Sequence, residues 1–327
     1  MADIAGFRRA AVLGTGQMGP GIAMLLAHGG LETVLVSRSA AGAEHGLEQA
    51  RELLQFWQER AITSATAVRA TLARLTVTSA RATAVGDADV VVESIVEDLS
   101  TKQALFAELE QETRPDALLC TNTSGLRISD IAITMQRPQR AYTTHFWNPP
   151  HLVPLVEIIV GERSDPAGAE RLRALLRACG KRPVVGLKDV PGQLGNRLQH
   201  AVIREALYML EEGIASAEDI EESLKAGPGI RWPVYGPFEH NDMVGLELTR
   251  AVQAAVIPSL AANVTPATLL DTKIAAGDLG VKSGQGHYPW TPERAAAVRR
   301  RRDEFLVERL RAEAEAANGN ATRGPGD

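Results

Sequence analysis

Short runs of apolar and β-branched residues alternate with longer segments of helical spacing through the first 190 residues of the chain. Strands that alternate with helices in this way predict a mostly parallel sheet covered by helices on both faces. A helix is expected at 101–110, where Ser100 and Gln103 could form a capping box. The pattern indicates an α/β domain with a doubly wound sheet. Its expected strands are 10–13, 33–36, 90–93, 118–121, 140–144, 153–159 and 184–185.

The pattern changes near Pro191 and Gly192, which mark a turn after the last expected strand. Apolar residues then recur at helical spacing from 194 to 210, and Gly213 is placed to end that helix. The sequence therefore predicts an α/β domain over 1–190 and an all-α domain over 191–316. Residues 317–327 contain little that could be buried, so disorder is expected there. Further helices of the second domain are expected at 218–226, 241–263 and 266–276.

Composition and charge narrow the classes of function. Apolar residues make up 45% of the 327, enough to fill a globular core, and the net charge of −5 comes without a basic stripe that would bind nucleic acid. Only Cys120 and Cys179 are present, outside any Cys/His cluster, so neither a disulfide framework nor a metal site is expected. No uncharged apolar run approaches the ~18 residues of a membrane span. We expect a cytoplasmic protein with no nucleic-acid or membrane partner.

The first expected strand leads into Gly14-Thr-Gly16-Gln17-Met18-Gly19, and a helix follows. Glycines at these positions permit a tight turn, let the backbone approach a pyrophosphate and allow the helix to pack on the sheet. The free N–H groups at the start of the helix can face the phosphates. In this context the pattern predicts a Rossmann-type dinucleotide-binding domain, and the alternative is a purely structural glycine turn.

The end of the second expected strand bears on which dinucleotide binds. An acidic residue for the ribose hydroxyls is expected about 20 residues after the glycines, but Ser37 and Arg38 stand there. A carboxylate would repel a 2′-phosphate, whereas a hydroxyl and a guanidinium can bind one. These residues favour NADP over NAD as the cofactor. Alternatively, Arg38 stacks on the adenine or is solvated.

A histidine that ends one expected strand and a glutamate within the next lie twelve residues apart, at His145 and Glu157. Across a short turn the two side chains can meet, and the carboxylate then controls the orientation and proton affinity of the imidazole. A proton acceptor and a hydride acceptor in one protein predict alcohol oxidation. A satisfied buried imidazole is the structural alternative for His145.

Two further side chains are candidates for binding the substrate. Ser124 follows an apolar strand at the expected carboxyl edge of the sheet, where open α/β folds bind ligands. Asn196 begins the long helix of the second domain and could present its amide to a cleft between the domains. The alternatives are a turn former at Ser124 and a structural residue of a first helical turn at Asn196.

Together these residues resemble the L-3-hydroxyacyl-CoA dehydrogenase family over nearly the whole chain. The resemblance implies that His145 is the catalytic base, that Glu157 is its partner and that Ser124 and Asn196 bind the substrate. It also implies that Glu97 and Lys102 lie on the nicotinamide side of the cofactor, with Asn122 beside them, and that the helical domains pair into a homodimer. The motifs that carry it are Gly14-Thr-Gly-Gln-Met-Gly19, Val92-Glu-Ser-Ile-Val-Glu97-Asp-Leu-Ser-Thr-Lys102, Asn122-Thr-Ser124, His145-Phe-Trp-Asn-Pro, Leu155-Val-Glu157 and Pro191-Gly-Gln-Leu-Gly-Asn196-Arg197.

The resemblance implies an NAD(P)-dependent oxidoreductase acting on a secondary alcohol of the 3-hydroxyacyl type. Members that act on CoA esters usually carry lysines after the second strand, whereas residues 39–75 contain none. The loop Asn148-Pro149-Pro150-His151 is closer to relatives that act on free carnitine, gulonate or pyridine-ring alcohols. A free hydroxy acid or alcohol is therefore the alternative substrate. His151 itself is expected at the surface of this loop, and contact with the substrate is its alternative role.

Two rival classes share the fold. β-Hydroxyacid dehydrogenases use a lysine one helical turn before an asparagine, but Gly192 stands four residues before Asn196 in this chain. A non-catalytic, crystallin-like binding protein would have no need of Ser124, His145, Glu157 and Asn196 together. Both rivals are disfavoured by these residues.

Overall fold

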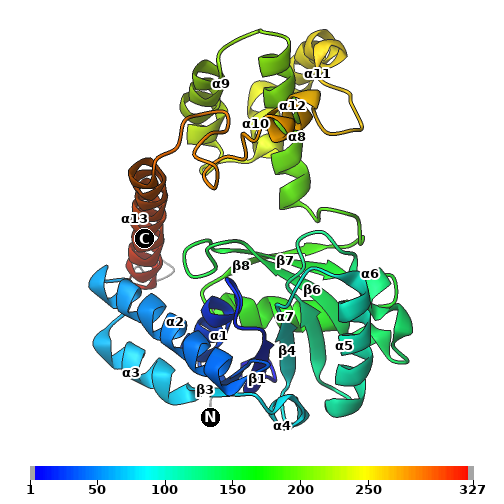
Figure 1. Cartoon of the computed structure of the whole chain (residues 1–327), viewed down its shortest axis with the longest axis vertical. Coiled ribbons are helices and arrows are strands. Elements are labelled where there is room, and N and C mark those ends of the chain that lie inside the picture. The colour runs from blue at the N-terminus through cyan, green and yellow to red at the C-terminus, as the bar shows by residue number, and fades with distance from the viewer. Residues whose placement is uncertain (1–3, 323–327) are drawn as a thin grey trace. The chain divides into compact units, whose positions relative to one another are not determined.

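The computed structural model of the chain, drawn in Figure 1, describes residues 4–322. Its contacts divide the chain into two units. One unit comprises Met1–Leu194 and Arg301–Asp327, and the other comprises Gly195–Arg300. The chain passes from the first unit to the second a few residues after the boundary predicted at 190–191, and it returns within the last helix.

The first unit is organised around one eight-stranded sheet in the order β3-β2-β1-β4-β5-β6-β7-β8. Every neighbouring pair is parallel except β6 and β7, which are antiparallel. The seven expected strands are present with bounds that differ by at most two residues. The sequence missed β3, because its four residues, Leu-Thr-Val-Thr, lack the continuous apolar run that marks the equally short β4 and β5. The strands are β1 (Arg9–Leu13), β2 (Glu32–Val36), β3 (Leu75–Thr78), β4 (Val90–Glu93), β5 (Leu118–Thr121), β6 (Ala141–Phe146), β7 (Leu155–Val160) and β8 (Arg182–Gly186).

Helices cover both faces of the sheet, each over its own hydrophobic core (Figure 1). Strand β1 shows the division, because Ala10 and Val12 belong to one core and Ala11 and Leu13 to the other. One face carries α1 (Gly19–His28), α2 (Ala40–Glu59), α3 (Ala65–Arg74) and α7 (Pro166–Ala178). The other carries α4 (Arg81–Gly86), α5 (Leu99–Glu112) and α6 (Ile128–Ile131), with the 3-10 turns η1 (Ala132–Thr134) and η2 (Pro138–Arg140) following α6 in the chain.

Helix α5 begins two residues before its predicted start, and its cap differs from the predicted one. Asp98 is the N-cap, and its carboxylate accepts a 2.8 Å hydrogen bond from the Thr101 N–H and another from the Ser100 hydroxyl. The hydrogen bonds from Thr101 and Ser100 lower the pKa of Asp98 to about 2. The expected capping box of Ser100 and Gln103 is therefore wrong, because an aspartate two residues earlier is a better acceptor for the free N–H groups.

The second unit is helical, as expected. Helix α8 ends where the sequence indicated, since Gly213 adopts a φ of +65° and the Ile214 N–H bonds to the Met209 carbonyl at 2.9 Å. The single helix expected at 241–263 is instead two helices, because Gly245 with a φ of +93° interrupts it. The elements are α8 (Gly195–Glu211), α9 (Ala217–Leu224), the π-helical turn η3 (Lys225–Gly229), α10 (Pro237–Val244), α11 (Leu246–Val256), the 3-10 turn η4 (Ile257–Ser259) and α12 (Thr268–Ala275).

The last helix, α13 (Pro292–Thr322), was not predicted. It continues through 317–322, where disorder was expected, because the preceding repeats of alanine and glutamate favour helix strongly. Arg311 Nε donates to the Arg60 carbonyl at 2.6 Å, which ties this helix to the end of α2. Residues 323–327 of the expected tail lie outside the described residues. Over residues 4–322, none of the helices is both long and apolar enough to cross a membrane.

Candidate active site

The antiparallel pairing of β6 and β7 brings His145 and Glu157 together. The two residues are direct register partners, and His145 Nδ1 lies 2.9 Å from Glu157 Oε2. Glu157 is fully buried and His145 is 7% exposed. Because a carboxylate can only accept, the neutral form of the imidazole carries its proton on Nδ1 and presents its lone pair on Nε2. The predicted contact between the two side chains is present, in the geometry of a general base and the group that orients it.

Two further N–H groups bind Glu157. Trp147 Nε1 donates to Oε2 at 2.9 Å, the same oxygen that faces His145. The Leu194 backbone N–H donates to the other oxygen, Oε1, at 2.8 Å. A buried carboxylate with hydrogen bonds to both oxygens is held in one rotamer, so the imidazole orientation is fixed as well.

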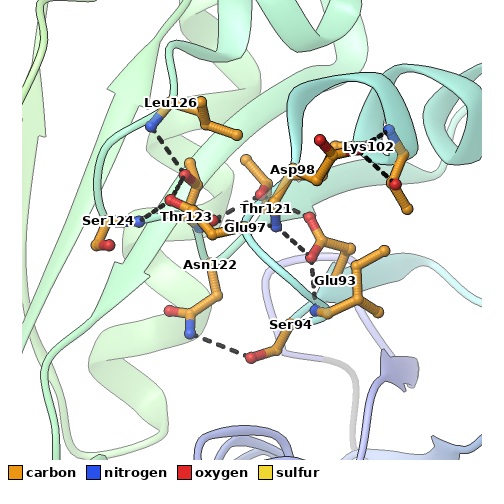
Figure 2. A network of polar contacts seen from close by, with 12 residues as sticks. Glu93, Ser94, Glu97, Asp98, Lys102, Thr121, Asn122, Thr123, Ser124 and Leu126 are labelled. Atoms are coloured by element: carbon orange, nitrogen blue, oxygen red, sulfur yellow. Dashed lines mark hydrogen bonds and ion pairs between the residues drawn. The ribbon is translucent and has the colours of Figure 1, made fainter.

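Ser124 stands in a turn that follows β5, and a carboxylate holds this turn (Figure 2). Glu97 Oε1 accepts hydrogen bonds from the backbone N–H groups of Ser124 and Gly125, each at 3.1 Å, and from the Thr123 hydroxyl. Burial alone would raise the pKa of Glu97, but the Thr123 hydrogen bond, the charge of Lys102 and the two backbone donors outweigh it and lower the pKa. Ser124 is exposed and lies at the carboxyl edge of the sheet, as expected.

Lys102 connects this turn to the end of β4. Its ammonium lies 2.5 Å from Glu93 Oε1 and 3.5 Å from Glu97 Oε2, and its side chain is only 1% exposed. Glu93 is fully buried and also accepts from the Thr121 hydroxyl at 2.7 Å and from the Ile95 N–H at 2.7 Å. The expected contact of Lys102 with a nicotinamide stays a prediction, and its burial between two carboxylates favours an indirect role through Glu97.

Asn122 joins three strands at the same edge of the sheet. Its Oδ1 accepts from the Phe146 N–H at 2.8 Å, next to His145, and its Nδ2 donates to the Ser94 hydroxyl at 3.3 Å (Figure 2). The side chain therefore links the ends of β4, β5 and β6. This arrangement sets the position of the end of β6, while the expected contact of Asn122 with the cofactor stays a prediction.

The glycine-rich turn lies between the carboxyl ends of β1 and β4, where the strand order reverses, which is the usual ligand position of such sheets. Gly14 has a φ of +107°, and a Cβ there would lie 2.4 Å from the Ser94 carbonyl oxygen. A Cβ on Gly19 would lie 1.8 Å from the Gly14 carbonyl oxygen. By contrast, a Cβ on the exposed Gly16 would meet no atom within 4 Å. The turn therefore fits a dinucleotide, with two glycines required by the fold and one facing open space, and Gln17 and Met18 complete it before α1.

Ser37 and Arg38 follow β2 beside this turn. The Ser37 hydroxyl lies 3.1 Å from the Thr15 hydroxyl, and the Ser37 N–H donates to the Thr78 carbonyl at 3.0 Å. Arg38 is exposed. A hydroxyl and a guanidinium therefore stand where a carboxylate was expected.

Asn196 is the second residue of α8 and belongs to the second unit, so its role beside Ser124 stays a prediction. The second unit also contains a mostly apolar cavity of about 720 Å³ between α8, α9, α12 and residues 279–290. None of the predicted site residues lines this cavity.

Sequence reasoning missed three contributors to the site. Glu93 ends an apolar strand, and an acidic residue in that place was itself the available signal. Trp147 lies within the motif around His145, but its indole contact with Glu157 depends on the pairing of β6 and β7. The Leu194 N–H could not be identified, because every backbone offers the same donor.

His151, expected at the loop surface, is half-buried and its ring packs edge-on against Phe56 at 5.4 Å between centroids.

Comparison with known proteins identifies the family. Residues 9–190 match the model of the 3-hydroxyacyl-CoA dehydrogenase NAD binding domain, and residues 192–290 match that of the 3-hydroxyacyl-CoA dehydrogenase C-terminal domain. Together the two matches cover most of the chain, including every predicted catalytic and cofactor residue.

Individual relatives differ in the substrates their names state. The chain is 33% identical over 305 residues to 5-formyl-3-hydroxy-2-methylpyridine 4-carboxylate 5-dehydrogenase of Mesorhizobium japonicum, covering 92% of this chain and 96% of that protein. It is 38% identical over 232 residues to L-carnitine dehydrogenase of Streptomyces coelicolor, covering 71% of each. A crystal structure of 5-formyl-3-hydroxy-2-methylpyridine 4-carboxylic acid 5-dehydrogenase, an NAD+-dependent dismutase, superposes with a TM-score of 0.86 at 32% identity, covering 94% of this chain and 98% of that one. The chain therefore belongs to the 3-hydroxyacyl-CoA dehydrogenase family and is an NAD-binding oxidoreductase that acts on CH–OH groups.

Proposed function

We propose that His145 is the acid–base group of this oxidoreductase and that Glu157 orients it. The observation that carries the proposal is the 2.9 Å contact between His145 Nδ1 and the fully buried Glu157 carboxylate. A bound nicotinamide would supply the hydride acceptor or donor. His145 Nε2 would take the proton of the substrate hydroxyl, and the charge of Glu157 would stabilise the imidazolium that forms. In the opposite direction His145 would return the proton to the substrate oxygen.

Ser124 is proposed to hold the substrate oxygen. Its turn is fixed by Glu97, and it lies at the sheet edge at which β6 presents His145. A hydroxyl on a fixed turn can donate to an alkoxide or carbonyl oxygen without losing conformational entropy during the reaction. Asn196, from the start of α8, is proposed as a second donor.

We propose a free hydroxy acid or ring alcohol as the substrate in place of a CoA ester. Similarity to the pyridine carboxylate dehydrogenase over 92% of the chain supports this choice, as does the absence of lysine from residues 39–75. Lysines there would offer charge to the phosphates of coenzyme A. The test is the change in nicotinamide absorbance with L-carnitine, L-gulonate, a hydroxymethylpyridine carboxylate and 3-hydroxybutyryl-CoA. A turnover preference for the CoA ester would contradict the proposal, and no turnover with any alcohol would favour a non-catalytic binding protein.

We propose that NADP binds more tightly than NAD. Support comes from the exposed guanidinium of Arg38 and the hydroxyl of Ser37 at the end of β2, where no carboxylate would repel a 2′-phosphate. Fluorescence titration with NADPH and NADH measures the preference directly. R38Q should weaken NADPH binding about tenfold and leave NADH binding nearly unchanged. Equal losses for both cofactors would show that Arg38 instead stacks on the adenine.

We propose that the second unit pairs with a second copy of the chain. Several large apolar side chains of this unit are more than 60% exposed, including Val234, Phe238, Met243 and Leu246. Exposed apolar side chains in this number are usual at protein interfaces. Sedimentation or light scattering at micromolar concentration distinguishes a homodimer from a monomer, and a monomeric mass would contradict the proposal.

A further inference from the structure

Trp147 and the imidazole of His145 contact the same oxygen of Glu157. Both His145 Nδ1 and Trp147 Nε1 lie 2.9 Å from Glu157 Oε2, whereas the Leu194 N–H binds Oε1. Trp147 follows His145 by two residues, just beyond the end of β6, and both side chains reach the same carboxylate oxygen. Their rings lie 5.8 Å apart between centroids at an interplanar angle of 51°.

We propose that Trp147 is a positioning residue, whose indole N–H fixes the Glu157 carboxylate and moderates its hold on the proton of His145. This inference rests on the proposed role of His145. The negative charge of Glu157 stabilises the protonated imidazole, and a second donor on the same oxygen draws part of that charge away. His145 then releases its proton more readily than it would beside an oxygen with one donor.

Burial makes the effect of this shared oxygen large enough to measure. Glu157 has no exposed surface, so its hydrogen bonds act in a medium of low polarity. The indole also packs beside the imidazole and limits the rotation of the His145 side chain. Removal of the N–H alone should therefore change proton binding, while removal of the whole ring should also loosen the imidazole.

The other titratable groups on the elements around His145 are the same in the wild-type protein and in the variant at position 147. On β5 the thiol of Cys120 has its pKa raised to about 12 by burial. Lys181 and Arg182 stand at the start of β8, and Lys188 and Asp189 lie between β8 and the linker. Glu93 ends β4, Glu97 lies between β4 and α5, and Lys102 is in the first turn of α5. A phenylalanine at 147 leaves all of them in place.

The test uses W147F, which keeps an aromatic ring and removes only the N–H donor. Its matched control is W57F, because Trp57 Nε1 also donates one hydrogen bond, at 3.1 Å, but to the backbone carbonyl of His151. The titration of the His145 ring C–H resonance is followed by proton NMR in the full-length protein without substrate, and H145Q assigns the resonance. A second variant, W147M, lacks both ring and donor and serves if W147F does not fold.

In W147F the midpoint of the His145 titration should move to higher pH by about half a unit, and in W57F it should not move. In an E157Q background, W147F should cause no further change, because the charge on which Trp147 acts is gone. An unchanged midpoint in W147F, or an equal shift in W57F, would overturn the inference.

Kinetics separates this inference from the proposed function. If the protein oxidises an alcohol, the acidic limb of log kcat/KM against pH should move with the NMR midpoint in W147F, and KM should change little. If no alcohol is oxidised, the proposed function fails, while the NMR titration still decides the role of Trp147.

Discussion

The backbone N–H of Leu194 lies 2.8 Å from Glu157 Oε1, so the last residue before the second unit binds the carboxylate that holds His145. Gln193, just before it, is 4% exposed and its side-chain amide donates to the Thr123 carbonyl at 3.4 Å, beside Ser124. The segment between the units therefore contacts both parts of the proposed site. Because these are short-range contacts, a change in this segment would directly affect the positions of Glu157 and His145.

Glu157 accepts hydrogen bonds from the N–H groups of His145, Trp147 and Leu194, so its replacement by glutamine should cause a large loss of activity. The amide of E157Q has one acceptor oxygen, so at least one donor would face another N–H group, and the charge that stabilises the imidazolium would be lost. We expect kcat to fall about 100-fold, with H145A causing a loss of similar or greater size. The measurements are initial rates and cofactor affinity, which should stay nearly unchanged in both variants.

The double variant H145A/E157Q provides the control. Residues that act as a unit are not additive, so its activity should lie close to that of H145A alone. Losses that multiply in the double variant would contradict a shared role for the pair.

Replacement by alanine should affect stability and cofactor binding differently at Gly14 and Gly16. In G14A, the new Cβ would lie 2.4 Å from the Ser94 carbonyl at a φ of +107°, so the fold itself should be destabilised by about 2 kcal/mol or more. In G16A the Cβ would meet no protein atom within 4 Å, so stability should be unaffected. Cofactor binding should nevertheless weaken at least tenfold in G16A, because the methyl group occupies the approach of the pyrophosphate.

Urea unfolding of G14A and G16A measures their stability, and titration with NADH measures their cofactor affinity. Wild-type cofactor affinity in G16A would place the dinucleotide elsewhere.

Removal of one partner of the buried pair of Lys102 and Glu93 should strongly lower the free energy of unfolding. K102M leaves the fully buried Glu93 carboxylate without its counter-charge, and such losses cost about 3–5 kcal/mol. The double variant K102M/E93Q should recover part of the stability, because no buried charge then stands unpaired. Free energies of unfolding in urea test both, with K225M as the control, since the Lys225 side chain is 63% exposed and should contribute almost nothing.

A loss in K102M no greater than that in K225M would show that water reaches the Glu93 carboxylate. Activity should fall in K102M as well, because Lys102 neutralises part of the charge on Glu97, which holds the Ser124 turn.

Because His151 is half-buried, the protein should lose stability in acid. Burial, the largest cause, lowers the pKa of His151 from 6.5 to about 4, and the charge of Lys181 adds to the lowering. Between these two pH values the unfolded chain binds a proton that the folded chain does not, so stability falls as the pH drops from 6.5 towards 4. The loss should reach about 3 kcal/mol at pH 4.

H151F should remove this part of the pH dependence, since phenylalanine cannot be protonated and keeps a ring against Phe56. Urea unfolding of both proteins at pH 7 and pH 4.5 gives the difference. Identical losses in the two proteins would assign the acid sensitivity to other groups.

The sequence by itself determined seven of the eight strands of the first unit and the pairing of His145 with Glu157. The strands Val90–Glu93 and Leu118–Thr121 are apolar except for their last residue. They were recognisable because both faces of a parallel sheet are buried. His145 and Glu157 could be paired in advance because a short antiparallel connection fixes the register of two strands. The glycine spacing likewise depends only on local backbone geometry.

Tertiary structure decided what no local pattern contains. The hydrogen bonds from Lys102 and Thr121 to Glu93 arise from segments that meet only when β4, α5 and β5 pack together. The indole donor at Glu157 likewise requires Trp147 to turn towards β7. The short β3 was missed because packing against the sheet outweighed a weak periodic signal. The long α13 was missed because helix propensity outweighed such a signal. Local periodicity reports which residues are buried, whereas the choice of partner for each buried polar group depends on contacts between residues far apart in the chain.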